Sequence, residues 1–380
     1  MRSDYTTEGL RACSKDHVSW RFYKVEFSLY DHTQGLSYPM KDCLFSIVSS
    51  DLHTQPGHPE SAARFSNLLQ WTDCPPYVGM HHITPQPARN DDLLRVHTPD
   101  MLLALRIACG MGLHQIEYAP TYVGGSSYEA ALMAAGATLE LNRQVLQPAS
   151  PARRAFAIVR PPGHHVDREH PAGFCLLNNL AVAVADALES GLQKVAIIDF
   201  DAHHGNGTQN IFLDDPRVGF FSMHQEGIYP GSGGLDEICL VQKRIINLPL
   251  PPNCGDEVFD LVSQSILKPW LQHLQPDMIF VSAGFDGHFN DPLTALNYST
   301  AGFYDFSRQI IEFAEQFSSG RVLFVLEGGY DARDLAENSQ AVLCALVGGD
   351  KYPNSNGQSQ HKPVNVTDRI RLLVKLHELA

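Results

Sequence analysis

The chain lacks two features that would assign it to common protein classes. Basic residues are few: Lys and Arg number 28 against 42 Asp and Glu, which gives a formal net charge of −14. A duplex DNA or RNA binder would show a basic face, so this balance argues against direct nucleic-acid binding. No stretch approaches the ~20 apolar residues that a membrane span needs, which argues against a membrane protein. A cationic or neutral small substrate is compatible with the charge.

Signatures of several other classes are missing as well. The eight cysteines form no C-x-x-C pair and are scattered, whereas a disulfide framework is dense in a short chain. We interpret them as mostly buried apolar side chains in a reducing compartment. The N-terminus (MRSDYTTEGLRACSKD) has no apolar core like that of a secretory signal, so we expect a cytoplasmic protein. No phosphate loop, dinucleotide fingerprint or G-x-S-x-G elbow occurs.

Hydrophobic residues (44%) and charged residues (18%) are balanced as in a protein with a sizeable core. Short apolar runs rich in Val, Ile or Phe predict buried strands at residues 155–159, 195–198, 218–222, 278–282 and 322–326. Helical patterns lie among them, at residues 128–146, 179–189, 259–274 and 303–317. This alternation predicts a single α/β domain with a central, mostly parallel sheet flanked by helices on both faces.

The ends of the chain differ from the middle. Residues 1–45 have mixed polarity without a clear period, and we treat them as an N-terminal extension of uncertain structure. Residues 46–350 would form the main domain. Residues 351–380 would form a polar linker (KYPNSNGQSQHKP) followed by an amphipathic final helix.

Polar residues of unusual kinds follow each of the five predicted strands. They are RPPGHH (160–165), DFDAHHGNGT (199–208), His224, AGFD ending at Asp286, and EGGY ending at Tyr330. In an open parallel sheet, ligands bind beyond the carboxyl ends of the strands. Because five consecutive runs deliver such residues to one edge, the sequence indicates a single site there.

Asp201, His203 and Asp286 are candidate ligands of one metal ion. Alternate residues of an extended chain point the same way, so Asp201 and His203 can face one ion while Asp199 lies one step deeper. Two carboxylates and an imidazole leave an open position, as in a catalytic zinc site. For the D-x-D-x-H pattern alone, a buried cluster that only caps loops is the alternative; the other polar strand ends disfavour it.

Acid–base candidates follow the first predicted strand. His164 and His165, held by a Pro-Pro-Gly turn, are placed to transfer protons in metal-assisted hydrolysis. Asp199 and Asn206 are the candidate partners that would fix their tautomers. An ordinary exposed loop would be the interpretation of the two histidines taken alone.

Two further positions have weaker signals. Tyr330 follows Gly328 and Gly329, which allow close backbone approach, and its phenol could donate a hydrogen bond to a developing oxyanion. A tyrosine at a strand end is usually a packing residue. Ser126 and Ser127 are expected to cap the helix that follows them.

Together these residues resemble the zinc-dependent histone deacetylase family, which includes acetylpolyamine amidohydrolases and bacterial deacetylase-like amidohydrolases. The resemblance covers about residues 51–347 and includes, in order, GHPESAAR (57–64), LLRVHTPD (93–100), RPPGHH (160–165), GFCLLNN (173–179), DFDAHHGNGTQNIF (199–212), YPGSG (229–233), SAGFDGHFNDPL (282–293) and LEGGYD (326–331). The sequence looks closest to class II members and their bacterial and plant relatives, because Asn206 stands where class I members carry Asp.

This resemblance implies an arginase/deacetylase-like fold with one Zn²⁺ per chain on the three ligands named above. The implied catalytic residues are His164, His165, Asp199, Asn206 and Tyr330. His165 would be the general base and acid with Asn206 as its partner, and His164, paired to Asp199, would assist electrostatically. Tyr330 would polarise the acetyl carbonyl and stabilise the oxyanion.

The resemblance also implies a substrate tunnel and monovalent-cation sites. Phe174 and Tyr229 would form apolar tunnel walls, and the tunnel residues would be Gly173, Phe174, Tyr229, Leu293, Gly328 and, at the rim, Ser126. Structural K⁺ or Na⁺ would bind at Asp199, Asp201, His203, Ser222 and Met223 and, in a second site, at Phe212, Asp215 and Val218.

The implied reaction is hydrolysis of an N-acetyl amide to acetate and a free amine. Leu293 stands where polyamine-specific eukaryotic relatives carry a selecting Glu, so acetyl-lysine in proteins or peptides is the favoured substrate. Acetylpolyamines and small aryl acetamides stay open as alternatives. The complete residue set disfavours a catalytically weak acetyl-lysine reader or scaffold, and the single ligand set disfavours a two-metal ureohydrolase. The sequence does not separate zinc from iron.

Overall fold

The computed structural model describes residues 40–150, 152–235, 237, 243–359 and 362–379. Most of the predicted extension 1–45 therefore lies outside the described residues. Strand β1 begins at Cys43, so the predicted start of the main domain at residue 46 falls inside a strand.

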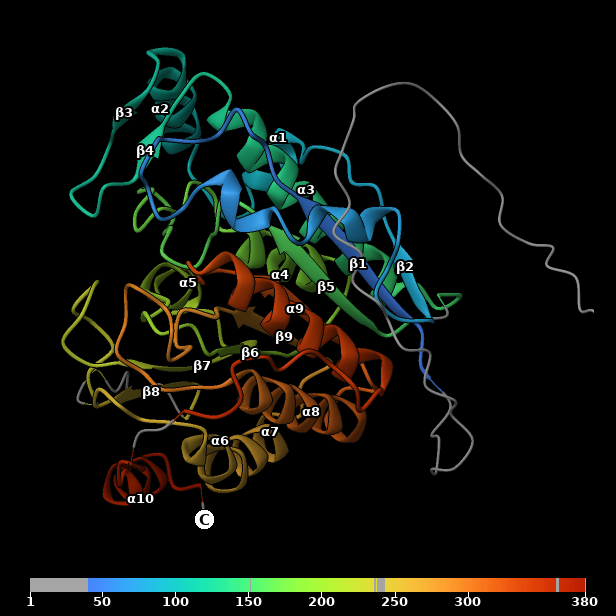
Figure 1. The fold of residues 1–380 in the computed structure, drawn as a ribbon, viewed down its shortest axis with the longest axis vertical. Helices are drawn as coiled ribbons and strands as arrows, with labels where there is room; N and C mark the ends of the chain where they lie inside the picture. The colour runs from blue at the N-terminus through green and yellow to red at the C-terminus, as the bar shows by residue number, and fades with distance from the viewer. Residues whose placement is uncertain (1–39, 151, 236, 238–242, 360–361, 380) are drawn as a thin grey trace, which may run out of the picture. The chain divides into compact units, whose positions relative to one another are not determined.

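An eight-stranded sheet, parallel throughout, forms the centre of the described part (Figure 1). Its spatial order is β2 (Met80–His82), β1 (Cys43–Val48), β5 (Arg154–Val159), β10 (Val322–Leu326), β9 (Met278–Ala283), β6 (Val195–Asp199), β7 (Val218–Gln225) and β8 (Ile245–Leu250). All five predicted strands are confirmed, and β1, β2 and β8 extend the sheet beyond them. A separate antiparallel pair joins β3 (His114–Gln115) to β4 (Tyr122–Val123).

Helices cover both faces of the sheet, as predicted. One face packs against α2 (Pro99–Gly110), α3 (Ser127–Leu146) and α4 (Asn179–Glu189). The other packs against α6 (Glu257–Val262), the π-helical turn Ser263–Leu267, α7 (Lys268–Leu274), α8 (Thr300–Phe317) and α9 (Ala332–Val347). The shorter helices are two 3₁₀ turns, Ala62–Phe65 and Leu69–Thr72, with α1 (Asn90–Leu93) and α5 (Asn206–Phe212).

Strand β5 shows why its sequence is apolar on both sides. Phe156 and Ile158 belong to the core under α6–α9, whereas Ala155, Ala157 and Val159 belong to the core under α2–α4. Side chains alternate between the two faces of a strand, so a strand that is covered by helices on both faces is apolar on both. The polar residues that follow the strands are therefore attached to a sheet that is packed on both faces.

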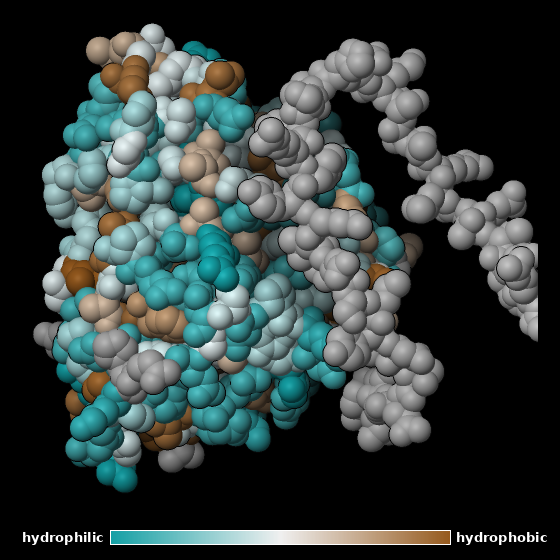
Figure 2. Space-filling view, in the orientation of Figure 1, coloured by the Kyte–Doolittle hydropathy of each residue, from teal (hydrophilic) through white to brown (hydrophobic). Residues whose placement is uncertain are grey.

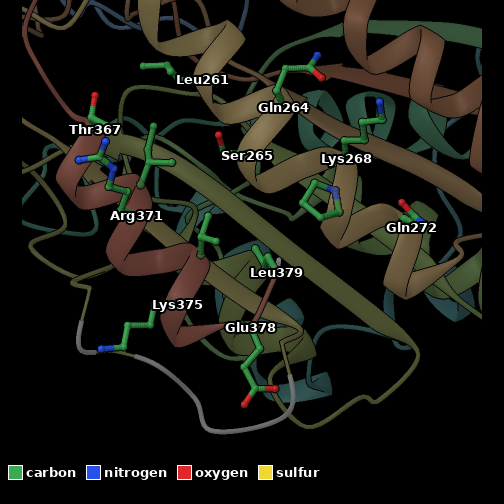
Figure 3. A pocket seen from close by; sticks show the side chains of 13 residues that line it. Leu261, Gln264, Ser265, Lys268, Gln272, Thr367, Arg371, Lys375, Glu378 and Leu379 are labelled. Carbon is green, nitrogen blue, oxygen red and sulfur yellow. The ribbon is translucent and has the colours of Figure 1, made fainter.

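The final helix is α10 (Thr367–Leu376), within the predicted residues 351–380. Ile370 and Leu373 are buried, and α10 contacts α6 and the π-helical turn, so it packs on the domain. Beside it lies a cavity of about 870 Å³ with apolar walls that include Leu261, Val374 and Leu379 (Figure 3). None of the predicted site residues lines this cavity.

The outer surface shown in Figure 2 is largely hydrophilic, with apolar residues in small separate groups. Exposed apolar side chains gather around the end of α2 and the turn that follows it, at Leu103, Ile107, Met111 and Leu113. In the described part of the chain, no helix combines the length and the apolar character needed to cross a membrane.

Candidate metal and acid–base site

The three predicted metal ligands converge at the carboxyl edge of the sheet. Strands β6 and β9 are neighbours, with Asp199 opposite Ser282, so the loops that follow them meet. Ligand atoms of Asp201, His203 and Asp286 all lie within 4.8 Å of one another. His203 Nδ1 is 2.7 Å from an oxygen of Asp286 and 3.2 Å from an oxygen of Asp201.

Backbone amides fix the two carboxylates of this cluster. The Gly328 N–H donates to Asp201 Oδ2 at 2.8 Å, and the Ala202 N–H donates to Asp286 Oδ1 at 2.9 Å. Gly328 has to be glycine, because a Cβ there would lie 2.6 Å from Asp286 and 2.7 Å from Asp201. This predicted tunnel residue therefore lies directly against the ligand cluster.

The electrostatics of the cluster fit a bound divalent cation. Both carboxylates are buried side by side, and they raise the pKa of His203 to about 10 against the opposing effect of burial. The cluster thus requires a positive charge between its carboxylates, which a divalent ion supplies. Two carboxylates and one imidazole are also a donor set that zinc accepts.

His164 and His165 lie side by side but carry different partners. His164 Nδ1 is 3.1 Å from Asp199 Oδ2, and His165 Nδ1 is 2.8 Å from Asn206 Oδ1. Their ring centroids are 4.0 Å apart, and the His165 ring is 6.0 Å from that of His203. The pairs expected from the sequence are the ones that form.

The surroundings push the pKa values of these two histidines in opposite directions. Burial lowers the pKa of His164, but the charges of Asp201 and Asp199 outweigh it and raise the pKa to about 10. Burial together with the positive charges of His164 and His203 holds the pKa of His165 well below its usual range. Because the Asn206 oxygen can only accept, His165 Nδ1 carries the proton and Nε2 is left as a base.

Aromatic side chains lie beside His165 and Tyr330. The Tyr229 ring is 4.9 Å from the His165 ring, and the Phe174 ring is 5.8 Å from the Tyr330 ring. Gly173 adopts φ +54° and packs so tightly that a Cβ would lie 2.2 Å from the His165 ring. These predicted tunnel residues therefore surround the side chains that the sequence assigns to catalysis.

Tyr330 is held from two sides. The Arg64 guanidinium lies 4.9 Å from its ring centroid, and the backbone N–H donates to Asp291 Oδ2 at 2.8 Å. Burial holds the pKa of the phenol well above its usual range, although the Arg64 charge opposes it. The phenol therefore stays protonated and can donate a hydrogen bond. Asp291 also accepts the Leu293 N–H at 2.9 Å. One side chain therefore fixes both the segment after β9 and the segment after β10.

Three residues that support the site were given no role by the sequence. Glu327 accepts the N–H groups of Gly163 and His164, at 2.7 and 3.1 Å. It therefore holds residues 160–165, the loop after β5 that carries the two histidines (the histidine loop). Arg64 donates to the Gly329 and Glu327 carbonyls, and Asp291 binds Tyr330 as described above. Each lies inside a motif that was recognised. The sequence signal for Glu327 was an acidic residue placed directly after an apolar strand, like the other residues of the site.

Ser126 has no contact that ties it to these residues in the described part of the chain. It is the N-cap residue of α3, but its hydroxyl forms no cap hydrogen bond, and within the described ranges no hydrogen bond or ring contact links its side chain to the site. Ser127 does not cap the helix either: its hydroxyl accepts the Gly124 N–H and contacts His53. The role of Ser126 at a tunnel rim stays a prediction without a contact to support it.

The two predicted monovalent-cation sites differ in how well they are formed. In the first, the pairing of β6 with β7 puts Ser222 opposite Asp199, so its predicted ligands are neighbours. In the second, the guanidinium of Arg244 donates to the carbonyls of Asp215 and Val218, both at 2.8 Å, and to that of Leu213. The residues of the second site therefore do not fit a bound ion, since a fixed side-chain cation already binds their oxygens.

We expect Arg244→Met to lower the free energy of unfolding by about 3 kcal/mol, because buried carbonyls lose charge-assisted hydrogen bonds. Urea unfolding measures this loss, and added KCl should recover part of it by binding the freed oxygens. The control is Arg217→Met, in the turn between α5 and β7, where the exposed Arg217–Asp215 pair is expected to contribute at most about 1 kcal/mol. Equal stability of the Arg244 variant and the wild type would contradict this assignment.

Comparison with known proteins identifies the family to which this architecture and motif set correspond. Residues 58–346 match the family described as "Histone deacetylase domain". Histone deacetylase 14, chloroplastic, of Arabidopsis thaliana is 35% identical over 325 residues, covering 81% of this chain and 77% of that protein. A probable deacetylase of Archaeoglobus fulgidus is 38% identical over 272 residues, covering 70% and 74%.

Two further relatives extend the comparison to enzymes and structures. A histone deacetylase-like amidohydrolase of Pseudomonas aeruginosa is 36% identical over 297 residues, covering 76% of each chain. The crystal structure of the HDA15 HD domain superposes with a TM-score of 0.76 at 28% identity, covering 88% of this chain and 95% of that one.

Proposed function

Because this chain belongs to the histone deacetylase family of metal-dependent amidohydrolases, we propose that it hydrolyses the N-acetyl amide of acetyl-lysine in proteins or peptides. The observation that carries the proposal is the pair of histidines beside the ligand cluster, one bound to Asp199 and the other to Asn206. A carboxylate partner favours the charged form of His164, and an amide partner leaves His165 free to act as a base, so the pair can stabilise charge and transfer a proton during water attack on an amide.

Asp201, His203 and Asp286 would hold one Zn²⁺, which when bound acidifies water and polarises a carbonyl. His165 Nε2 takes a proton from the attacking water, while Asn206 holds Nδ1–H in place. The same nitrogen then returns the proton to the leaving amine. The His164 cation, bound to Asp199, stabilises the negative charge that develops beside it.

Tyr330 supplies the second stabilising group. Its protonated phenol donates a hydrogen bond to the oxyanion, an interaction that strengthens as the carbonyl oxygen gains charge. Arg64 lies against the ring of Tyr330, and Asp291 fixes its backbone N–H. Removal of one such donor typically reduces kcat by about 10²–10³-fold.

The surrounding side chains favour an extended aliphatic substrate. Tyr229 lies beside His165 and Phe174 lies beside Tyr330, so the two rings would exclude water and contact the methylene groups of a lysine side chain. Leu293, which is 38% exposed, adds an apolar group and no charge at the edge. Small acetylated amines, including acetylpolyamines and aryl acetamides, fit the same chemistry and form the second arm of the test.

Amine release from acetyl-lysine peptides, acetylpolyamines and aryl acetamides by the zinc-loaded protein tests this function. We expect the highest kcat/KM for the peptides, by at least about 10-fold, because apolar pockets discriminate by about 10–200-fold. The His165→Ala variant is the blank. A preference for either small-amine class would replace the substrate, and no turnover by zinc-bound protein would overturn the deacetylase assignment.

A further inference from the structure

We propose that Glu117, with the rings of Tyr118 and Tyr229, binds a positively charged group that the substrate carries next to its acetylated chain. This inference rests on the proposed function and names the kind of substrate that the site prefers. The shared chemistry is an ammonium or guanidinium, from a basic residue of a peptide or from the distal amine of a polyamine.

The position of Glu117 is fixed by contacts to the residues around His165. It lies in the loop between β3 and β4, and its Oε2 accepts the Gly173 N–H at 3.3 Å and the Thr121 hydroxyl at 3.1 Å. That hydroxyl in turn accepts the Phe174 N–H at 2.9 Å. Gly173 packs against the His165 ring, so a single residue separates the Glu117 carboxylate from the proposed base.

The charge of Glu117 has no cationic partner in the structure. Across the ranges that the structure describes, no Lys, Arg or His forms an ion pair with it, and both of its hydrogen bonds involve the same oxygen. The side chain is half-buried, so its charge is only partly screened by solvent. Burial raises the pKa of Tyr229, and the charge of Glu117 raises it further, as expected for two side chains that lie close together.

Two aromatic rings complete the environment of a cation. The Tyr118 and Tyr229 ring centroids are 5.8 Å apart, and Tyr118 is 83% exposed. A cation over a tyrosine face is attracted by the negative face of the ring, and a nearby carboxylate adds to this attraction. Tyr229 also contacts the His165 ring, so the same residue would join the cation to the reacting end of the substrate.

A purely structural role for Glu117 is the alternative, because its carboxylate also holds the Gly173 amide. Glu117→Gln separates the two roles. The amide oxygen of glutamine can accept the same two hydrogen bonds, so the Gly173–Phe174 segment keeps its support while the charge is removed. Glu129→Gln, an exposed acid in the first turn of α3, is the matched control.

The experiment measures kcat/KM for substrate pairs that differ only in charge. One pair is an acetyl-lysine peptide with a neighbouring arginine or its neutral isostere citrulline. The other is an N-acetyl diamine or the corresponding N-acetyl amino alcohol. The zinc-loaded full chain should prefer at least one charged member by about 5–20-fold, and the preference should fall as salt is added.

In Glu117→Gln this preference should fall to about 1–2-fold, while kcat/KM for the neutral members stays unchanged. The Glu129→Gln control should keep the wild-type preference. An effect confined to the peptide pair or to the diamine pair identifies the source of the cation. Turnover with an unchanged preference in Glu117→Gln overturns the role of Glu117 alone. No turnover of any pair by the wild type overturns the proposed function and this inference with it.

Discussion

Replacing His165 by alanine should lower kcat for acetyl-lysine peptides by about 10²–10⁴-fold, the usual contribution of a positioned general acid–base. The structure leaves this proton transfer to His165, because the neighbouring His164 is held in its charged form by Asp199 and Asp201. Steady-state kinetics with zinc-loaded protein measure the effect. Zinc content should not change, since His165 is not one of the three converging ligands.

His170→Ala provides the matched control for this variant. His170 lies five positions further along the chain, with an exposed side chain whose ring nitrogen pairs with Asp167. Its removal should leave kcat and KM within about 2-fold of the wild type, as for most exposed positions. If His165→Ala retained more than about a tenth of the wild-type kcat, the assignment of this base would be wrong.

Replacing Asp286 by asparagine should reduce zinc from one ion per chain to a small fraction of that, with activity lost on the order of 10³-fold. Asparagine keeps the size of the side chain and can still accept the Ala202 N–H. The negative charge beside His203 is removed. Elemental analysis after dialysis against a weak chelator measures the zinc, and circular dichroism confirms that the variant is folded.

Asp214→Asn, at an exposed position in the turn after α5, controls for the change of residue type and should retain full zinc and activity. A folded Asp286→Asn variant that kept stoichiometric zinc at unchanged affinity would show that the ion binds elsewhere. Loss of zinc with full activity retained would contradict metal-dependent hydrolysis at this cluster.

The centre of the sheet could be predicted because its strands are covered on both faces and each contains an unbroken run of at least four apolar residues or glycine. Strands β1 and β8 could not, because polar residues interrupt their apolar runs. Ser46 in β1 donates to the Ile83 carbonyl, and Asn247 in β8 donates to Gln209. The partners in these two hydrogen bonds lie 37 and 38 residues away, so no local pattern marks the side chains as buried.

The candidate site shows the same division. Asp201 and His203 could be paired from their spacing, and Asp286 from its place after a neighbouring strand. Arg64 could not be placed beside Tyr330, because it binds the backbone carbonyl of Gly329, 265 residues away. Arg244 likewise binds carbonyl oxygens, which have no side-chain signature. Hydrogen bonds from a side chain to a distant backbone carbonyl are therefore the part of the site that could not be predicted from the sequence.

The position of β10 has a consequence for the order in which a growing chain can assemble. This strand separates β2-β1-β5 from β9-β6-β7-β8, and it pairs with both β5 and β9. Until residues 322–326 have been synthesised, each block has an open edge where β10 belongs. The histidine loop follows β5 and the metal ligands follow β6 and β9, so they belong to different blocks. A nascent chain can gather its metal ligands once β9 and Asp286 have been made, but strand pairing aligns them with their base only after β10 has been added.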